Sequence, residues 1–273
     1  MRLGWMGCAA AMVLSASVFA AGQSGPKPVL TGVAHVALRV TNMEDELAFL
    51  AKLGFEMSSA VEKDGKVQFY FVKINDTEFI EVHPKIAPNG TPQPLGYNHI
   101  CFVTNNANAL YAQWAAAGLK PTDVSKGPDG TAEFGAKDPE GRLTEALEIL
   151  PGSDPDKDKG KHLGAARVST WLMGVDLPVG DVAAEQKFFE GVGFTGKVEG
   201  ENVSLSAPGS NVRLVLRPAK EGVKPKLMFQ IDETAKAAAA LTGAGLKFDR
   251  SPLSLVVLDP DGNQIQLRAF PKL

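Results

Sequence analysis

The sequence predicts an α+β protein in which four βαβββ units are paired into two domains. Three observations carry this prediction. First, a segment made of an apolar strand, an amphipathic helix and a closing glycine occurs four times, and in every copy 19 residues separate its first residue from that glycine. Second, further β segments follow each helix. Third, a polar segment divides the chain near its middle. The four copies begin at His35, His99, Gly174 and Lys226.

The first strand of the first unit is VAHVALRV, residues 33–40. Alternation places one apolar set of side chains on one face: Ala34, Val36, Leu38 and Val40. The other face carries His35 with Val33, Ala37 and Arg39. A strand that packs on one side needs only the first set, so the histidine must be explained by what it faces.

Each helix is bounded by residues that favour its ends. A short side-chain oxygen can accept from the free N–H groups of a first helical turn, and the predicted N-caps are Asn42, Asn105, Asp181 and Asp232. The closing glycines suit the left-handed backbone that ends a helix, and they are Gly54, Gly118, Gly193 and Gly245.

The β segments after the helices complete the units. In the first unit they span 67–74 and 77–84, and in the third they are NVSLSA and NVRLVLRP. In the second and fourth units a DPxG turn, at 138–141 or 259–262, precedes the last strand. The two domains are therefore placed at about 30–150 and 168–270, with a linker over 151–167 that begins PGSDPDKDKGKH.

Composition excludes some classes of function. The 273 residues carry a formal net charge of −3 without a block of Lys or Arg, so no nucleic-acid partner is expected. Residues 1–21 are interpreted as a signal peptide, with Arg2 before the apolar run 8–19 and small residues at its end. The mature protein is then expected to be secreted or periplasmic, with no membrane association, and to keep Cys101 as its one cysteine.

The repeated units, the LGF that closes the first helix and the two DPxG turns resemble the vicinal oxygen chelate (VOC) superfamily. That superfamily includes glyoxalase I, methylmalonyl-CoA epimerase, extradiol dioxygenases and bleomycin resistance proteins. The resemblance implies two glyoxalase-like domains with curved mixed sheets. It also implies that two units share one metal, whose ligands come from the first and last strand of each unit.

Carried over onto this sequence, the resemblance implies four metal ligands in the first domain: His35, Glu81, His99 and Glu145. The separation from histidine to glutamate is 46 residues in both units, as expected if two copies of one unit supply a shared centre. Two imidazoles and two carboxylates suit a divalent metal such as Zn, Ni, Co, Mn or Fe.

The second domain serves as an internal control. Its equivalent positions are Gly174, about Val215, Lys226 and Gln266. This half keeps the strands, helices and turns but not the ligands, so the four ligand residues are not needed for folding. It is expected to be a degenerate, metal-free domain.

Other residues near these positions are secondary candidates. Glu148 is a rival to Glu145 as the last ligand, although it has the opposite parity in the strand. His83 shares the face of Glu81, and Tyr97 shares the face of His99; both could contact substrate, as could Arg39. Cys101 is interpreted as a small core residue.

Four ligands leave two open positions on an octahedral metal, which fit two adjacent oxygens of a small substrate. This favours lyase or isomerase chemistry of the glyoxalase and epimerase type, with Glu81 or Glu145 as the base that moves the proton. An extradiol dioxygenase, which uses two histidines and one carboxylate, is the alternative. A drug-sequestering protein without catalysis is a third. Four units in one chain are compatible with a monomer or a homodimer.

Overall fold

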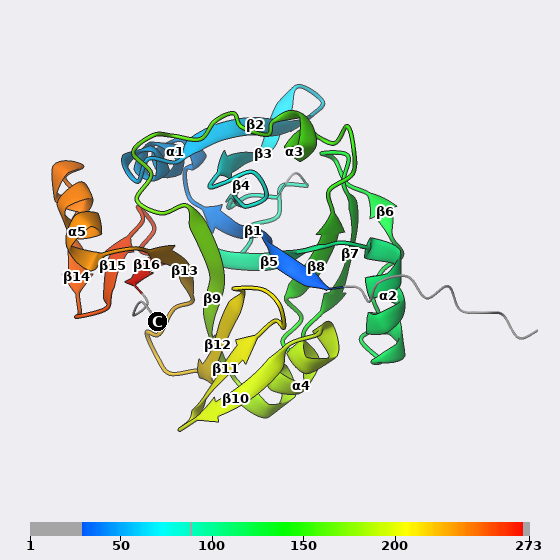
Figure 1. The fold of residues 1–273 in the computed structure, drawn as a ribbon. Coiled ribbons are helices and arrows are strands. Elements are labelled where there is room, and N and C mark those ends of the chain that lie inside the picture. Colours follow the sequence, from blue (N-terminus) through cyan, green and yellow to red (C-terminus); the bar gives the residue numbers. More distant parts are fainter. Residues whose placement is uncertain (1–28, 88, 270–273) are drawn as a thin grey trace, which may run out of the picture.

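The computed structural model describes residues 29–87 and 89–269, so the predicted signal peptide lies outside the described residues. Two eight-stranded sheets dominate the fold (Figure 1). The first sheet has the order β2-β3-β4-β1-β5-β8-β7-β6, and the second has β10-β11-β12-β9-β13-β16-β15-β14. Strands of the first sheet are β1 (Leu30–Val40), β2 (Glu56–Lys63), β3 (Lys66–Lys73), β4 (Phe79–Pro84), β5 (Gly96–Thr104), β6 (Ser125–Lys126), β7 (Ala132–Lys137) and β8 (Leu143–Glu148).

Strands of the second sheet repeat the same arrangement: β9 (Trp171–Val179), β10 (Thr195–Glu199), β11 (Asn202–Ser206), β12 (Arg213–Pro218), β13 (Lys226–Ile231), β14 (Phe248–Arg250), β15 (Ser254–Leu258) and β16 (Gln264–Ala269). In every unit the first strand pairs in parallel with the last, and the two first strands of a sheet pair antiparallel. The predicted α+β class with four βαβββ units is confirmed.

One helix follows the first strand of each unit: α1 (Met43–Lys52), α2 (Ala107–Ala116), α4 (Val182–Val192) and α5 (Thr234–Gly243). Asn42 and Asp181 cap α1 and α4 as predicted. The prediction of Asn105 is wrong, because its side-chain oxygen accepts from the backbone of Val29, and Asn106 caps α2 instead. Asp232 is also not the cap, since α5 begins one residue later than predicted and has Glu233 at the N-cap position without a side-chain bond.

All four closing glycines have positive φ, as predicted. Gly54 has a second reason to be glycine. A Cβ atom there would lie 2.5 Å from the carbonyl oxygen of Ala166, in the segment that joins the two halves. The chain can pass this closely only over a residue without a side chain.

Strict alternation fails at the start of β1. The pairing with β5 shifts register between Val33 and His35, so Val33 packs in the main core while Ala34 turns to the face of His35. A β-bulge inserts one extra residue and so reverses the expected parity on one side of it. The face that carries His35 therefore has a small apolar cluster of its own, formed by Ala34, Cys101, Val103 and Leu147.

The main core continues from one half of the protein into the other. Trp114 is fully buried, and its indole N–H donates to the carbonyl of Val192. The ring of Phe55 stacks on that of Phe229, with centroids 5.5 Å apart. The two halves thus share buried apolar surface, which is the main favourable term in their association.

The segment between the sheets is ordered and contains a short helix, α3 (Asp154–Lys157). We call residues 150–162 the strap, because this segment crosses the first sheet beside β3 (Figure 1). Its polar composition predicted a linker but gave no sign of this packing. Among the described residues, no helix is long and apolar enough to cross a membrane.

Candidate metal centre

Four adjacent central strands bring the predicted ligand residues together. His35 lies on β1, Glu81 on β4, His99 on β5 and Glu145 on β8. Glu81 and His99 flank the same residue of β1, Ala37, from opposite sides. Cys101 lies between His35 and Glu145 in the same way. Side chains of paired residues share a face of the sheet, so all four point to one place.

The donor atoms converge closely. The two Nε2 atoms of His35 and His99 are 3.0 Å apart. Glu145 Oε2 lies 3.4 Å from His35 Nε2 and 3.2 Å from His99 Nε2. The oxygens of Glu81 are 3.5 Å from the same two nitrogens. Both histidines and Glu81 are buried. The structure therefore places these four donors around a common point.

This cluster needs a positive charge at its centre. Burial alone would lower the pKa of His35, but Glu81 and Glu145 raise it to about 9. Burial opposes the ionisation of Glu145, yet its hydrogen bonds to the two imidazoles hold its pKa well below its usual range. The raised pKa means that a proton on His35 balances part of the negative charge when no ion is bound. A divalent cation would replace this proton and bind both ring nitrogens and both carboxylates. That donor set fits a divalent cation.

Second partners orient the donors. His83 Nε2 lies 2.8 Å from Glu81 Oε2, and its ring stacks on Phe69 with centroids 4.4 Å apart. The side-chain amide of Asn98 lies 3.1 Å from His99 Nδ1. Metal binding through Nε2 requires a proton on Nδ1, so the amide oxygen of Asn98 would face this nitrogen in the metal-bound protein.

Glycine makes room for one of the carboxylates. Gly135 on β7 is paired with Glu145, and a Cβ atom at Gly135 would lie 3.1 Å from Glu145 Cγ and 2.9 Å from a methyl carbon of Leu143. A side chain at this position would push Glu145 out of place.

Comparison with known proteins agrees with the fold. Residues 32–146, which contain all four donors, match the family model described as the Glyoxalase/Bleomycin resistance protein/Dioxygenase superfamily. This part of the chain belongs to that superfamily. No curated protein is similar enough in sequence to count as a relative.

Solved structures of the superfamily's fold cover both halves. A catechol 2,3-dioxygenase matches 89% of this chain and 89% of its own, with a TM-score of 0.69 and 15% identity. The 2,3-dioxygenase LapB from Pseudomonas sp. KL28 matches 89% of this chain and 93% of its own, with a TM-score of 0.69 and 16% identity. The Mn(II)-bound glyoxalase from Novosphingobium aromaticivorans matches 89% of this chain and 83% of its own, with a TM-score of 0.67 and 18% identity. Identities this low show the shared fold alone.

The structure separates the secondary candidates. Glu148 is excluded as a donor, because its carboxylate accepts from the backbone N–H of Ala107 at the start of α2. Tyr97 packs against the main core and not beside His99, since the β1–β5 register shifts between Ala37 and Leu38 and so reverses the expected parity. Arg39 lies opposite His83 in the register of β1 and β4, and its guanidinium donates to the carbonyl of Pro84.

Cys101 is closer to the centre than predicted. Its sulfur, a nitrogen of His35 and a carboxylate oxygen of Glu145 all lie within 4.8 Å of one another. Burial raises the pKa of the thiol well above its usual range, so the sulfur is protonated at neutral pH. Cys101 therefore forms part of the wall of the centre, and its prediction as a plain core residue is incomplete.

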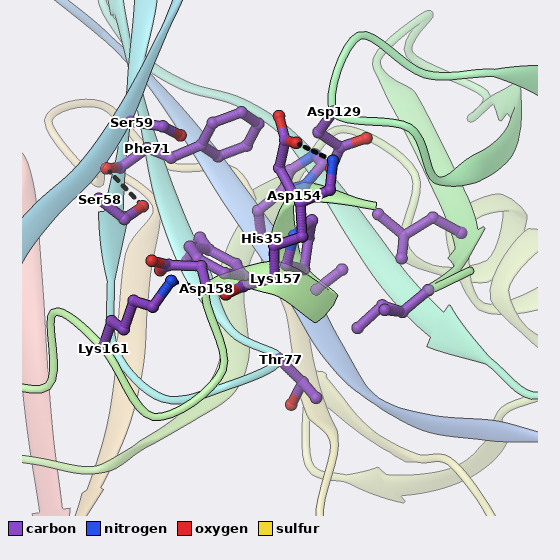
Figure 2. Close-up of a pocket in the computed structure, with 15 residues that line it drawn as sticks. His35, Ser58, Ser59, Phe71, Thr77, Asp129, Asp154, Lys157, Asp158 and Lys161 are labelled. Atoms are coloured by element: carbon purple, nitrogen blue, oxygen red, sulfur yellow. Dashed lines mark hydrogen bonds and ion pairs between the residues drawn. The ribbon is translucent and has the colours of Figure 1, made fainter. Parts of the chain in front are cut away.

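A cavity of about 220 Å³ lies beside His35, between the first sheet and the strap (Figure 2). Its sheet side is mostly apolar, with Ala34, Phe71, Phe79, Leu147 and Ile149, and it also carries Ser58 and Ser59 of β2. The opposite wall comes from the strap, through Asp154, Pro155, Lys157, Asp158 and Lys161. A substrate at the centre would thus lie in a small, partly apolar space that residues far apart in the sequence enclose.

Glu133 of β7 is a functional candidate that the sequence analysis missed. It pairs with Leu147, a residue of the cavity wall, and so lies on the face of Glu145. Burial and the nearby charge of Glu145 raise the pKa of Glu133 to about 7. Glu133 lies in a strand that the sequence analysis did not predict, so no periodicity indicated which face its side chain would take.

A buried lysine fastens the strap. The side chain of Lys73 at the end of β3 is fully buried. Its ammonium donates to the backbone carbonyl of Asp158 at 2.5 Å and to the Asp158 carboxylate at 3.0 Å, and it lies 3.1 Å from Asp76. Asp76 also accepts from the backbone N–H of Gly160 at 2.7 Å. The outer wall of the cavity thus depends on one lysine.

We expect Lys73→Met to loosen the strap while the sheets persist. Methionine fills similar volume but leaves Asp158 and Asp76 without their cation, at a cost of about 2 kcal/mol in unfolding free energy. Urea unfolding measures that cost, and limited proteolysis should cut within 150–162 at least tenfold faster than in wild type. Lys159→Met, which removes an exposed lysine of the same strap, is the control and should change neither. Equal proteolysis of all three proteins would contradict the role of Lys73.

The second sheet has a different group at the corresponding point. Register places Gly174, Val215, Lys226 and Gln266 at the positions of His35, Glu81, His99 and Glu145. Buried Asp176, at the position of Ala37, forms an ion pair with Arg217, at the position of His83. Lys226 Nζ lies 3.9 Å from the same carboxylate. Side-chain cations of the chain thus occupy the place where the first sheet gathers its donors.

Proposed function

We propose that this protein is a divalent-metal-dependent enzyme that binds a small substrate through two adjacent oxygens and transfers a proton beside a carbonyl group. The observation that carries the proposal is the convergence of two imidazoles and two carboxylates. Each imidazole Nε2 lies within 3.5 Å of the other Nε2 and of an oxygen of each carboxylate. Four protein ligands leave two positions of an octahedral ion for the substrate. His35, Glu81, His99 and Glu145 would hold the ion.

A divalent ion held there would supply Lewis acidity that stabilises negative charge on the substrate oxygens. Glu81 is the carboxylate best placed to leave the ion and accept the proton, because His83 contacts its Oε2, the oxygen 3.5 Å from His99 Nε2, and so offers that oxygen a partner other than the ion. Burial would raise the pKa of Glu81, but the neighbouring histidines lower it, so the carboxylate is ionised and ready to accept a proton. Glu133, on the cavity side of Glu145, offers a second place for that proton.

Zn, Ni, Co, Mn and Fe all suit this donor set. The glyoxalase from Novosphingobium aromaticivorans, which shares the fold, is described as Mn(II)-bound, and this supports Mn among the candidates. Secretion, which rests on the signal peptide predicted for residues 1–21, belongs to the same proposal.

The size of the cavity limits the substrate. Pockets for drug-sized ligands hold about 300–1,000 Å³, whereas this cavity holds about 220 Å³. A glutathione adduct could not lie wholly beside His35 under the strap and would have to extend into solvent. We therefore propose a compact substrate, with about one ring or a short chain, that lies against Phe71 and Phe79.

A ring-cleaving dioxygenase is the second candidate, and one specific observation favours it. If the bond between His83 and Glu81 keeps that carboxylate off the metal, the remaining donors are His35, His99 and Glu145. Two histidines and one carboxylate are the ligands of the oxygen-activating iron site. The aromatic cavity wall fits a catechol, and several proteins that share the fold are described as catechol or 2,3-dioxygenases.

Metal content followed by substrate turnover tests the proposal. The purified protein should contain a divalent first-row metal by elemental analysis, and chelation should lower its melting temperature. Small hydroxy-carbonyl compounds should then be converted equally under air and under argon. Conversion of catechols under air only, with oxygen uptake, would assign the dioxygenase. No metal, and no effect of a chelator on stability, would favour a sequestering protein and end the enzymatic proposal.

A further inference from the structure

Two related junctions hold the halves of the protein together, and neither belongs to the metal centre. In each, the first helix of one half packs against the DPxG loop of the other. At the first junction, α1 meets loop 259–263, and the backbone N–H of Thr41 donates to Asp261 at 2.7 Å. At the second, α4 meets loop 138–142, and the backbone N–H of Gly180 donates to Glu140 at 2.5 Å.

The second junction contains its own cation. Arg142 donates to Asp138 of its own loop at 2.7 Å and to buried Glu185 of α4 at 3.1 Å. A third contact, at 3.2 Å, joins its guanidinium to Glu140. One arginine thus bridges the three carboxylates that meet between the halves, and its planar group suits several acceptors at once.

The first junction has the same carboxylates without the cation. Glu46 of α1 corresponds to Glu185, Asp259 to Asp138, and Asn263 to Arg142. Asn263 gives both Asp259 oxygens a hydrogen bond at 2.6 Å but has no group that reaches further. Glu46 is 1% exposed, and neither of its oxygens has a hydrogen-bond donor among the described residues.

Two facing carboxylates are both acceptors, so no bond can form between them until one of them carries a proton. Leaving a buried charge unpaired costs far more than binding a proton. We propose that the first junction takes up one proton from solution in place of the missing guanidinium, so that Glu46 is a carboxylic acid that donates a hydrogen bond to Asp259 across the two halves.

The charges around Glu46 agree with this. The groups that act on it are Asp259 and Asp261 of the facing loop, and both are acidic. On α1, Asp45 and Lys52 line the shallow pocket beside Asp259, and Asn263 donates hydrogen bonds that the Asp259 carboxylate accepts. Lys224 binds backbone carbonyls of the loop.

The direction of the pKa shifts supports the comparison between the junctions. Burial and the charge of Asp259 raise the pKa of Glu46 to about 9. At the second junction, burial and Asp138 raise the pKa of Glu185 only to about 7, because Arg142 opposes the shift. The arginine thus performs the task that a proton performs at the first junction.

The expected pH dependence has a definite sign. The folded protein keeps a proton on Glu46 that the unfolded chain releases above the ordinary pKa of a glutamate. The stability that this group contributes is therefore complete at acidic pH, and it falls as pH rises until about 9. One such proton changes the unfolding equilibrium constant by about tenfold per pH unit.

Urea unfolding of the full chain between pH 5 and 9 tests the proposal against two variants. Glu46→Gln keeps the shape and supplies a permanent donor, and Asn263→Arg supplies the guanidinium of the second junction. Neither variant should release the Glu46 proton on unfolding. With each pH unit, the unfolding equilibrium constant of wild type should therefore rise about tenfold more than that of either variant. Arg142→Asn should acquire an added pH dependence at the second junction.

The proposal would be overturned if the unfolding constants of wild type and Glu46→Gln changed equally with pH. It would also be overturned if Mg²⁺ or Ca²⁺ stabilised wild type but not Glu46→Gln at pH 8, because a metal ion and not a proton would then occupy the junction. Should Asn263→Arg fail to fold, the comparison with Glu46→Gln still decides the result.

Discussion

His35→Ala should abolish stoichiometric metal binding and turnover while the protein stays folded. Partners that merely orient a metal ligand change affinity by about 10–100-fold, so removal of a donor should exceed that range. A bound ion at 100 times its Kd adds about 2.7 kcal/mol to the stability of wild type. A chelator should therefore lower the melting temperature of wild type and leave that of the variant unchanged. His99→Ala should behave in the same way.

The control for this experiment comes from the second sheet. Gln266 occupies the position of Glu145 there, and Gln266→Ala should keep the metal content of wild type. Gly174, at the position of His35, cannot serve as a control. It has φ +143°, and a Cβ atom would lie 2.0 Å from the carbonyl oxygen of Arg213. Loss of metal in Gln266→Ala, or an unfolded His35→Ala in a protein that never held metal, would contradict the proposed centre.

Sequence repetition predicted the fold well because the same pattern of strand, helix and glycine can be recognised separately in each of the four units. The strands, the helices and the closing glycines recur at a fixed spacing. The resemblance to the VOC superfamily pointed to Glu81 and Glu145, and the 46-residue separation from each histidine agreed with that choice. The register of β1 with β4 and of β5 with β8 then brings each glutamate beside the histidines. Local periodicity is sufficient here because the site lies on central strands and not on loops.

The failures of the sequence prediction share a different cause. The β-bulges that turn Ala34 to the cavity face and Tyr97 to the core depend on pairing between strands and leave no mark in one strand's alternation. The strap looked like an ordinary linker, since its packing depends on Lys73, which is distant in sequence and lies in the β segment predicted over 67–74. Tertiary contacts of this kind lie beyond any pattern within one segment.

The two sheets also explain why the second half keeps the fold without the donors. In each sheet the first strands of the two units pair at the middle, and charged or candidate metal-binding side chains meet there. In the second sheet Asp176 meets Arg217 and Lys226, so the negative charge of its carboxylate is balanced by side chains of the protein itself. In the first sheet the corresponding point has donors only, and the balancing charge must come from solution. That difference is the physical basis for placing function in the first half.

Glu81→Gln should separate the two candidate reactions. If Glu81 accepts the substrate proton, its amide cannot, and kcat should fall by about 10²–10⁴-fold while part of the metal remains. Turnover of hydroxy-carbonyl substrates and metal content, measured on the same sample, test this. If the protein is instead a dioxygenase with His35, His99 and Glu145 as ligands, the variant should keep its oxygen uptake with catechols.

Glu148→Gln is the matched control for that variant, because the substitution is the same and lies three residues beyond Glu145 in β8, on the face toward α2. Its carboxylate accepts from Ala107 at the start of that helix, so the variant should lose about 1 kcal/mol of stability and keep full turnover. His83→Phe adds a second test. It preserves stacking on Phe69 but frees Glu81, and it should reduce kcat if His83 positions the base. Unchanged turnover in both Glu81→Gln and His83→Phe would show that neither residue takes part in proton transfer, and the base would then have to be Glu145 or Glu133.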